Sequence, residues 1–295
     1  MVPQSSQLRV TVEGNPVHVR RGKNDGFWSN YDRGIWEPGT QAVFRRFIDK
    51  QHSYIDIGAW IGPTLLLGCQ LAKRAYGVEP DPIAYAELVE NIKYNRPLTN
   101  NVRLFNICIT PVSGKVSFGS RGDGGDSMSS LLFSSGRTSW TVDGMSLQEW
   151  IERNEINDCN FIKIDIEGGE YSVLPTMTAY LRSHRPTLHL SLHPCFLGQQ
   201  EVRGVNAKLK RSLLRLENTI RILKMLRFYE YFYDPRGKVP SLGMTSLYSC
   251  LRHCLAKIRW KPVALLVMCM DSIRGNSSAL VLTDQKWDVT AASPS

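Results

Sequence analysis

The sequence predicts a Rossmann-like α/β fold, in which a mostly parallel sheet is covered by helices on both faces. Three observations predict it. Short apolar runs of strand length alternate with helix-length segments between residues 53 and 194. A glycine-punctuated turn, Gly58–Gly62, follows the first of these runs and opens a helix. The chain has 295 residues, of which 42% are hydrophobic, so it can bury a core of this kind.

The strand and helix signals follow one another along the chain. Strands are predicted at residues 53–58, 75–79, 102–109, 160–165 and 187–194, with two late strands at 227–234 and 279–283. Helices are predicted at residues 40–50, 63–73, 82–94, 146–154, 171–183 and 208–226. Asp81 and Pro82 favour the start of the helix at 82–94, as its cap and first residue. Repeated strand–helix units of this kind indicate parallel strands.

The flanking segments are less regular. Residues 9–20 alternate around a Gly-Asn-Pro turn and predict a short hairpin, and residues 23–39 predict a loop rich in aromatic residues. The Gly/Ser-rich stretch Gly119–Gly136 predicts a loop on the ligand side of the sheet. We therefore expect residues 1–50 to pack a hairpin, an aromatic loop and a helix on the core. Residues 51–295 are expected to form the cofactor-binding domain, with a basic helical segment at about 203–261.

The net charge of +9 is concentrated in that basic segment. Residues 203–261 contain 14 Lys and Arg against three acidic residues, so the rest of the chain is slightly acidic. Such a segment is a candidate for contact with acidic lipid or a membrane surface, and a solvated helix face is the alternative. We expect no specific nucleic-acid partner.

Composition also predicts the compartment. The first residues lack the basic start and apolar run of a signal peptide, and the longest apolar run, 263–270, is too short to cross a bilayer. Seven scattered cysteines fit a reducing environment better than a disulfide framework. The expectation is a cytoplasmic protein, with peripheral contact at a membrane as the alternative.

Acidic residues lie at the ends of two neighbouring predicted strands, beside the glycine turn. Asp56 comes just before Gly58, and Glu79 ends the next strand 23 residues after Asp56. An acid at that second strand end can accept both ribose hydroxyls of a nucleoside, and glycines let a ligand approach the backbone. The candidate cofactor-binding residues at these strand ends are Asp56, Gly58, Ala59, Gly62, Glu79 and Asn106.

A dinucleotide site is the rival interpretation of this turn. The glycines follow the pattern G-x-x-x-G, without the second glycine that admits a pyrophosphate in G-x-G-x-x-G. The carboxylate of Asp56 would repel a pyrophosphate and suits a ligand with an ammonium group, such as the methionine part of S-adenosylmethionine (SAM). These two features favour SAM over a nicotinamide dinucleotide.

A second motif, FIKIDIEGGEYSVLP at residues 161–175, carries a family resemblance. Together with IDIGAWIG at 55–62 and GVEPDP at 77–82, it resembles the FkbM family of SAM-dependent methyltransferases, over about residues 36–195. The resemblance implies a class I methyltransferase fold, with a seven-stranded sheet that contains one antiparallel strand. It also implies O-methylation, often of sugars or glycan precursors.

The resemblance assigns roles to matching residues. It implies that Asp56, Gly58 and Gly62 lie near the methionine and that Glu79 binds the ribose. It also adds Asp165, at the floor of the site, to the candidate cofactor-binding residues. Three residues depart from the family pattern and bear on the acceptor rather than the cofactor. Trp60 and Gln148 stand where relatives usually have Asn and Asp, and His193 stands where an acid is more common.

Asp165, Glu167 and His193 are the candidate catalytic residues, because the ends of neighbouring parallel strands would bring them together. His193 could take the proton of an acceptor hydroxyl. The same three residues are candidate ligands of a divalent metal that acidifies the hydroxyl, and the metal requirement is left open. The alternative for Glu167 and Glu170 is capping of the following helix. His189 lies deeper in its strand and is expected to be a core histidine.

The function that these features favour is SAM-dependent O-methylation of a hydroxyl on a sugar, glycan precursor or related small molecule. Two rivals stay open. One is an NAD-dependent oxidoreductase, which the glycine pattern disfavours. The other is a non-catalytic module of the same fold that binds a membrane or RNA through its basic segment, because a fold alone does not prove catalysis.

Overall fold

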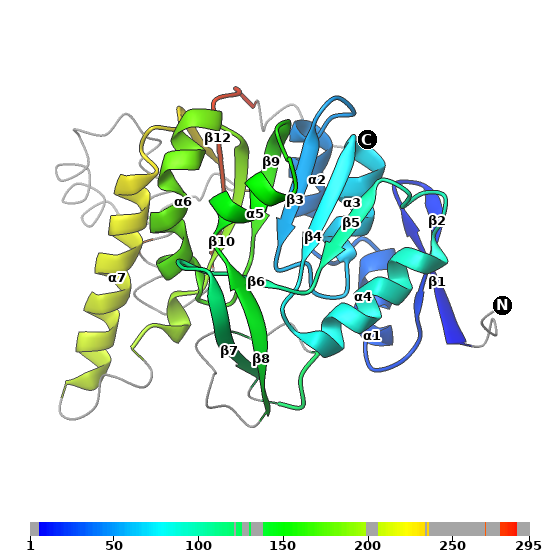
Figure 1. Ribbon diagram of the computed structural model, residues 1–295, viewed down its shortest axis with the longest axis horizontal. Helices are drawn as coiled ribbons and strands as arrows, with labels where there is room; N and C mark the ends of the chain where they lie inside the picture. Colours follow the sequence, from blue (N-terminus) through cyan, green and yellow to red (C-terminus); the bar gives the residue numbers. More distant parts are fainter. Residues whose placement is uncertain are drawn as a thin grey trace. The chain divides into compact units, whose positions relative to one another are not determined.

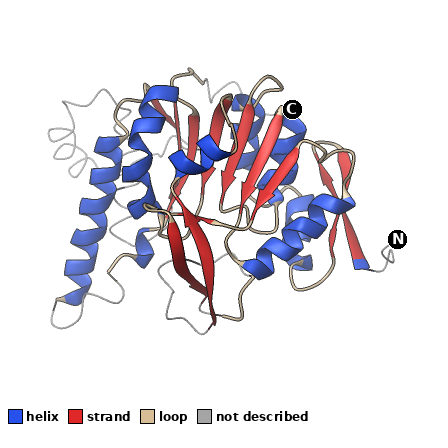
Figure 2. Ribbon diagram, in the orientation of Figure 1, coloured by secondary structure: helices blue, strands red, loops and turns tan. Residues whose placement is uncertain are grey.

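The computed structural model describes residues 6–120, 122–125, 130, 138–198, 206–233, 235, 269 and 278–287. The chain forms two compact units, Met1–Lys163 and Ile164–Ser295, and each combines strands with helices (Figure 1, Figure 2). Most of the Gly/Ser-rich stretch and most of residues 235–278 lie outside the described residues.

Four strands of the seven-stranded main sheet belong to the first unit, in the order β9-β3-β4-β5. Their bounds are β3 (Ser53–Ile57), β4 (Arg74–Val78), β5 (Val102–Phe105) and β9 (Cys159–Ile164). β4 pairs in parallel with both β3 and β5, and every residue of β3 is buried. Parallel neighbours end at the same edge of a sheet, so the residues that follow β3 and β4 are brought together there.

Helices cover both faces of this part of the sheet (Figure 1). They are α2 (Pro38–Phe47) and α3 (Pro63–Leu71) on one face and α5 (Leu147–Arg153) on the other. On the first face the rings of Phe44 and Tyr54 lie 5.3 Å apart. Tyr76 pairs with Ile55, the strand neighbour of Tyr54, and therefore points to the opposite face, where its ring lies 6.1 Å from that of Trp150.

A short helix, α1 (Asp25–Asp32), occupies part of the segment predicted as a loop at 23–39, so that prediction is wrong there. Trp28 and Tyr31 lie three residues apart on one helix face, both buried, with ring centroids 5.7 Å apart. The sequence does not predict this helix, because Gly26 and its neighbours favour turns. The helix is stabilised by packing of the two aromatic side chains rather than by the helix propensity of its residues.

The predicted N-terminal hairpin is confirmed. β1 (Gln7–Val12) and β2 (Asn15–Arg20) pair antiparallel around a turn at Glu13 and Gly14. Helix α4 (Pro82–Tyr94) lies against this hairpin, where the Asn91 side chain accepts a hydrogen bond from the Arg20 backbone N–H at 2.6 Å.

A small second sheet, in the order β6-β8-β7, was not predicted. Its strands are β6 (Cys108–Ile109), β7 (Gly114–Ser120) and β8 (Thr138–Met145). The single strand predicted at 102–109 is split, because β5 ends at Phe105 and β6 begins at Cys108. The side chains of Phe118, Val142 and Cys108 form the buried cluster of this sheet.

The second unit contains three strands in the order β11-β12-β10. Their bounds are β10 (Thr187–Leu192), β11 (Tyr231–Tyr233) and β12 (Ser278–Thr283). β12 runs antiparallel to both neighbours, which confirms the two late strands and the single antiparallel strand implied by the resemblance. Helices α6 (Glu170–His184) and α7 (Ala207–Met225) pack against each other, and a 3-10 turn, Pro194–Phe196, follows β10.

The Rossmann-like α/β fold class is confirmed. Strands and helices alternate as predicted, and β4 of the mostly parallel sheet pairs in parallel with its neighbours on both sides. Within the part of the chain that the structure describes, no helix is both long enough and apolar enough to cross a membrane.

Candidate functional site

The glycine turn after β3 uses its backbone donors within the protein. The N–H groups of Gly58 and Ala59 donate to the Val78 carbonyl at 3.0 and 3.1 Å, and that of Gly62 donates to the Ala59 carbonyl at 2.9 Å. Gly58 and Gly62 have φ angles of 85° and 98°, in the left-handed region that favours glycine. Because these donors are engaged, the turn is poorly suited to cradle a pyrophosphate, which disfavours a dinucleotide.

Asp56 is fully buried, and both of its carboxylate oxygens have partners. Oδ2 accepts hydrogen bonds from the Tyr54 hydroxyl at 2.6 Å and the Thr64 hydroxyl at 2.7 Å. Oδ1 lies 3.2 Å from Nζ of Lys163, which also donates to the Gly58 carbonyl at 3.1 Å. The buried ion pair thus fixes the start of the glycine turn. A role of Asp56 beside the ammonium of a ligand stays a prediction.

Glu79 follows β4, with its buried carboxylate turned toward two backbone donors. Oε2 accepts from the N–H of Trp60 and Oε1 from the N–H of Asp81, each at 2.8 Å. Burial raises the pKa of Glu79 to about 7, although the two backbone hydrogen bonds act to lower it. Each carboxylate oxygen has a second lone pair, so the group can also accept two hydroxyls.

Asn106 supports the turn that carries Glu79. Its Nδ2 donates to the carbonyl of Glu79 at 2.8 Å and to that of Pro80 at 3.2 Å. The structure therefore places Asn106 beside Glu79, as predicted from the strand ends, and gives its amide a backbone-holding role.

The described residues 122–125 lie at the same strand ends. The N–H of Gly125 donates to Oδ2 of Asp81 at 2.6 Å, and the Gly125 carbonyl accepts from the Trp60 indole at 3.3 Å. Nζ of Lys23 donates to the Gly124 carbonyl at 2.8 Å. Oδ1 of Asp81 meanwhile caps α4, as predicted. Trp60 thus contributes its amide to Glu79 and its side chain to this loop.

The aromatic side chains of residues 27–36 pack mainly on one another. Trp28 and Tyr31 are buried, and Tyr31 stacks on Trp36 with ring centroids 5.4 Å apart. Phe27 contacts the Trp60 ring edge to face at 4.7 Å. Packing within the protein therefore accounts for Trp28 and Tyr31.

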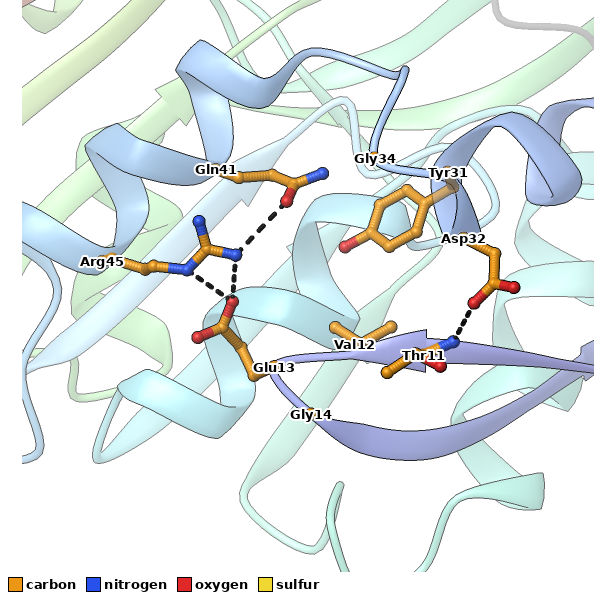
Figure 3. Close-up of a pocket in the computed structure, with 9 residues that line it drawn as sticks. All are labelled: Thr11, Val12, Glu13, Gly14, Tyr31, Asp32, Gly34, Gln41 and Arg45. Carbon is orange, nitrogen blue, oxygen red and sulfur yellow. Dashed lines mark hydrogen bonds and ion pairs between the residues drawn. The ribbon is translucent and has the colours of Figure 1, made fainter. Parts of the chain in front are cut away.

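A surface pocket of about 350 Å³ lies between the hairpin, α1 and α2 (Figure 3). The Arg45 guanidinium pairs with Glu13 at 2.7 Å, and Asp32 accepts from the Thr11 backbone N–H at 2.6 Å. None of the predicted cofactor-binding residues lines this pocket. Because its main charged groups are already paired within the protein, we assign the pocket no role in the reaction.

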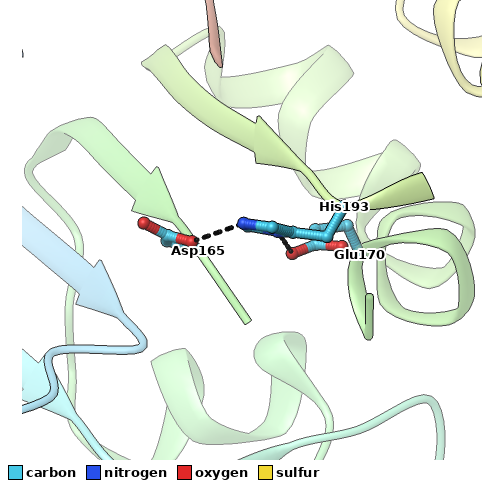
Figure 4. A group of neighbouring side chains, drawn as sticks. All are labelled: Asp165, Glu170 and His193. Atoms are coloured by element: carbon cyan, nitrogen blue, oxygen red, sulfur yellow. Dashed lines mark hydrogen bonds and ion pairs between the residues drawn. The ribbon is translucent and has the colours of Figure 1, made fainter. Parts of the chain in front are cut away.

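Glu170 and His193 form a buried pair in the second unit (Figure 4). Nδ1 of His193 lies 2.9 Å from Oε1 of Glu170. The same carboxylate accepts the N–H groups of Ile166 at 3.0 Å and Gly168 at 2.9 Å, just before α6. Glu170 thus holds the turn that precedes α6, although α6 has no side-chain cap, so the capping alternative is not what the structure shows. Glu170 also orients the His193 ring, which the sequence did not predict.

The other ring nitrogen of His193 faces two carboxylates. Nε2 lies 3.6 Å from Oδ1 of Asp165 and 3.7 Å from Oε2 of Glu167. Burial alone lowers the pKa of His193, but the hydrogen bond and charge of Glu170, with the charges of Asp165 and Glu167, raise it to about 9. The three predicted catalytic residues are thus brought together. Glu167 adopts a φ of 50°, a backbone strain often found at functional sites.

This cluster can either exchange a proton or hold a cation. Ligand atoms of Asp165, Glu170 and His193 all lie within 4.8 Å of one another. Glu170 already accepts three hydrogen bonds, so a cation would be held better by Nε2 of His193 with Asp165 and Glu167, while Glu170 oriented the ring. His189 is buried in β10, as expected for a core histidine.

Sequence reasoning missed Lys163 as the partner of Asp56. Its signal was available, because a lysine in the otherwise apolar strand FIKI needs a buried acid as partner. The Tyr54 and Thr64 donors to Asp56, and the link between Glu170 and His193, carry no comparable signal.

Comparison with protein families places the chain. Residues 56–233, more than half of the sequence, match the methyltransferase FkbM domain. The protein therefore belongs to the FkbM methyltransferase family. The predicted family is confirmed, and membership supports the predicted class of enzyme, a methyltransferase that uses SAM. A search of curated proteins found no match.

Solved structures with similar folds were also found. One is an FkbM methyltransferase from Methylobacillus flagellatus, 17% identical, covering 67% of this chain and 54% of its own, with a TM-score of 0.38. A precorrin-6y C5,15-methyltransferase from Geobacter metallireducens is 13% identical, covering 63% and 70%, with a TM-score of 0.33. An rRNA methylase from Streptococcus thermophilus is 6% identical, covering 84% and 95%, with a TM-score of 0.40. The chain spans about half the length of the first.

Proposed function

We propose that this protein transfers the methyl group of SAM to a hydroxyl group of a sugar, a glycan precursor or a related small molecule. The observation that carries the proposal is the arrangement around His193. Glu170 holds Nδ1, and Nε2 faces the carboxylates of Asp165 and Glu167. A hydroxyl must lose its proton when it is methylated, so its enzyme needs a group that can take a proton.

The residues after β3 and β4 fit the cofactor by the chemistry of their donors. The buried carboxylate of Glu79 has lone pairs for the two ribose hydroxyls, and the Asp56–Lys163 pair keeps the glycine turn in place. When bound, SAM supplies an electrophilic methyl group attached to a positively charged sulfur. Methyl transfer to a hydroxyl also requires removal of the hydroxyl proton, and a side chain of the protein must accept that proton.

His193 is the proposed general base. In its neutral form Nε2 accepts the proton of the hydroxyl as the oxygen bonds to the methyl carbon and the carbon–sulfur bond breaks. The imidazolium that forms is stabilised by Glu170, Asp165 and Glu167. Those same carboxylates keep the ring protonated at neutral pH in the free enzyme, so the proposed base works best in alkaline solution. The alternative mechanism is a divalent metal held by Asp165, Glu167 and His193, which would acidify the acceptor hydroxyl.

A methyl-transfer screen tests this proposal. The full chain would be incubated with methyl-labelled SAM and a panel of sugars, nucleotide sugars and glycolipids, with deoxy analogues as matched controls. We expect label to enter a hydroxyl-bearing acceptor and not the analogue that lacks that hydroxyl. Transfer only to nitrogen or carbon acceptors would overturn O-methylation while leaving the methyltransferase class intact.

Ligand-induced stabilisation separates the rivals. SAM and S-adenosylhomocysteine should raise the melting temperature, because a ligand of the native state stabilises it, and NAD should not. A shift with NAD and none with SAM would favour the oxidoreductase. SAM binding without transfer to any acceptor would favour the non-catalytic module.

A further inference from the structure

An apolar stripe runs along α7 in addition to the face that packs on the core. Leu209, Leu213, Leu216 and Ile220 recur at the three- and four-residue spacing that aligns side chains along a helix. None of them is buried, and Leu209 and Leu213 are 60% and 56% exposed. Large aliphatic side chains this open on a helix favour contact with something outside the unit.

The core face of α7 is a different one. Thr219, Ile222 and Leu223 are its buried residues, and Thr219 hydrogen-bonds Tyr171 of α6 at 3.2 Å. At 3.6 residues per turn, this face and the stripe are separated by about a quarter turn of the helix. Leu223, which follows the stripe at the same spacing, is buried and belongs to the core face instead.

Basic residues surround the stripe. α7 contains six Lys and Arg and one acidic residue, Glu217. Lys208 and Lys210 are exposed next to Leu209, and Lys224 is exposed beyond Ile220. A helix with cationic residues beside exposed leucines has the composition of helices that lie in the interface of an anionic membrane.

We propose that α7 docks on an anionic phospholipid surface, with the stripe of Leu209, Leu213, Leu216 and Ile220 in the interface and its lysines on the headgroup phosphates. Two other occupants fit less well. An RNA would pair with the basic residues but gain nothing from exposed leucines. A second copy of α7 would bring like charges together around the shared apolar contact.

Vesicle binding tests the proposal. The full chain would be co-sedimented with vesicles of phosphatidylcholine, with and without phosphatidylserine, at low and high salt. We expect binding to the phosphatidylserine vesicles that weakens with salt, since screening reduces attraction between exposed charges. No binding, or equal binding to both kinds of vesicle, would overturn the proposal.

Two variants separate the apolar and the ionic parts. Leu209→Gln with Leu213→Gln keeps the charge and should weaken binding about tenfold or more, because burying one leucine corresponds to at least that factor. Lys208→Gln with Lys210→Gln should weaken binding mainly at low salt. Val112→Gln is the matched control, because Val112 is 76% exposed in the first unit and lies outside α7.

Each of these side chains is exposed, so all three variants should keep the wild-type melting temperature. Binding of Leu209→Gln/Leu213→Gln equal to that of wild type would overturn the proposal. It would also be overturned if that variant instead dissolved a dimer seen by light scattering, or if RNA competed the vesicles away from wild type and variant alike.

Discussion

The pKa values of Glu79 and His193 are both raised above those of exposed groups of their kind, but for different reasons. Burial favours the uncharged acid at Glu79 and raises its pKa to about 7. At His193 burial acts against the charged ring, but three carboxylates outweigh it and raise the pKa to about 9. Perturbed groups such as these occur at functional sites more often than elsewhere. They therefore give two residue-scale predictions.

Replacing Glu79 should weaken SAM binding. Glu79→Ala removes the charged acceptor of two ribose hydroxyls, a loss of about 1–3 kcal/mol measurable by calorimetry. In wild type the ionised carboxylate is the better acceptor. Affinity should therefore be full above pH 7 and fall as the pH drops through about 7, where Glu79 takes up a proton.

Glu87→Gln is the matched control for this experiment. Glu87 is also a buried acid of the first unit with a pKa raised by burial, but it bonds Asn24 at 2.9 Å and lies outside the proposed site. It should keep both the affinity for SAM and its pH dependence. Unchanged SAM affinity in Glu79→Ala would remove Glu79 from the cofactor site.

Replacing His193 or Glu170 should distinguish the general-base mechanism from the metal-dependent mechanism. His193→Asn should lower kcat by about 10²–10⁴ while SAM still binds. In wild type the active, neutral ring appears only as the pH rises toward about 9. Glu170→Gln removes a carboxylate charge that raises this pKa, so the rise in kcat should move to lower pH.

The pH–rate profile and the effect of a chelator distinguish a general base from a metal site. If full turnover is restored to chelated enzyme only by a divalent metal, the cluster is a metal site and not a base. Full turnover by His193→Asn in enzyme that is insensitive to chelator would remove both mechanisms and leave positioning of the acceptor as the catalytic device.

At the scale of elements, the sequence predicts those whose pattern is local. The strand of residues 53–57 contains the apolar side chains of Tyr54, Ile55 and Ile57, and the helix 82–94 has its cap and first-turn proline, so both predictions agree with the structure. Helix α1 was missed because Trp28 and Tyr31 stabilise it by packing, which no local rule detects. The alternation of Val116 with Phe118 and of Trp140 with Val142 would have predicted the hairpin of β7 and β8.

In the candidate site, too, the sequence predicts which residues come together but not the partners that those residues bind. Parallel strand ends bring Asp165 and Glu167 to His193, as topology alone required. The partners that set their chemistry could not be predicted. Glu170 reaches His193 across 23 residues of sequence, and Trp60 gives Glu79 a main-chain donor that its side chain does not reveal.

The ion pair between β3 and β9 gives a prediction at the element scale. Lys163→Met leaves the carboxylate of Asp56 buried without a positive partner, and should lower the free energy of unfolding by about 3–5 kcal/mol. Urea denaturation would measure the loss. Lys73→Met is the control, since its pair with Asp158 is half exposed and worth about 0–1 kcal/mol. Equal effects of the two substitutions would contradict the prediction.

At the scale of the whole molecule, charge and chemistry are divided along the chain. The residues proposed to bind the cofactor lie in the first unit, apart from Asp165, and the proton-handling cluster lies in the second. The excess positive charge falls in residues 203–261 of the second unit. An acceptor that carries phosphate would be attracted to the second unit at long range, and the attraction would weaken with salt.

The pairing of Asp56 with Lys163 also constrains the order of folding during synthesis. The two residues are 107 positions apart, so the ribosome makes β3 long before its neutralising lysine exists. Until then, burial of the ionised Asp56 carboxylate costs free energy, and β3 gains its full stability only after β9 has been synthesised and has paired with it. Lys163 belongs to β9, the last strand of the first unit to be synthesised, so the ion pair that neutralises Asp56 can form only after the other strands of that unit have been made.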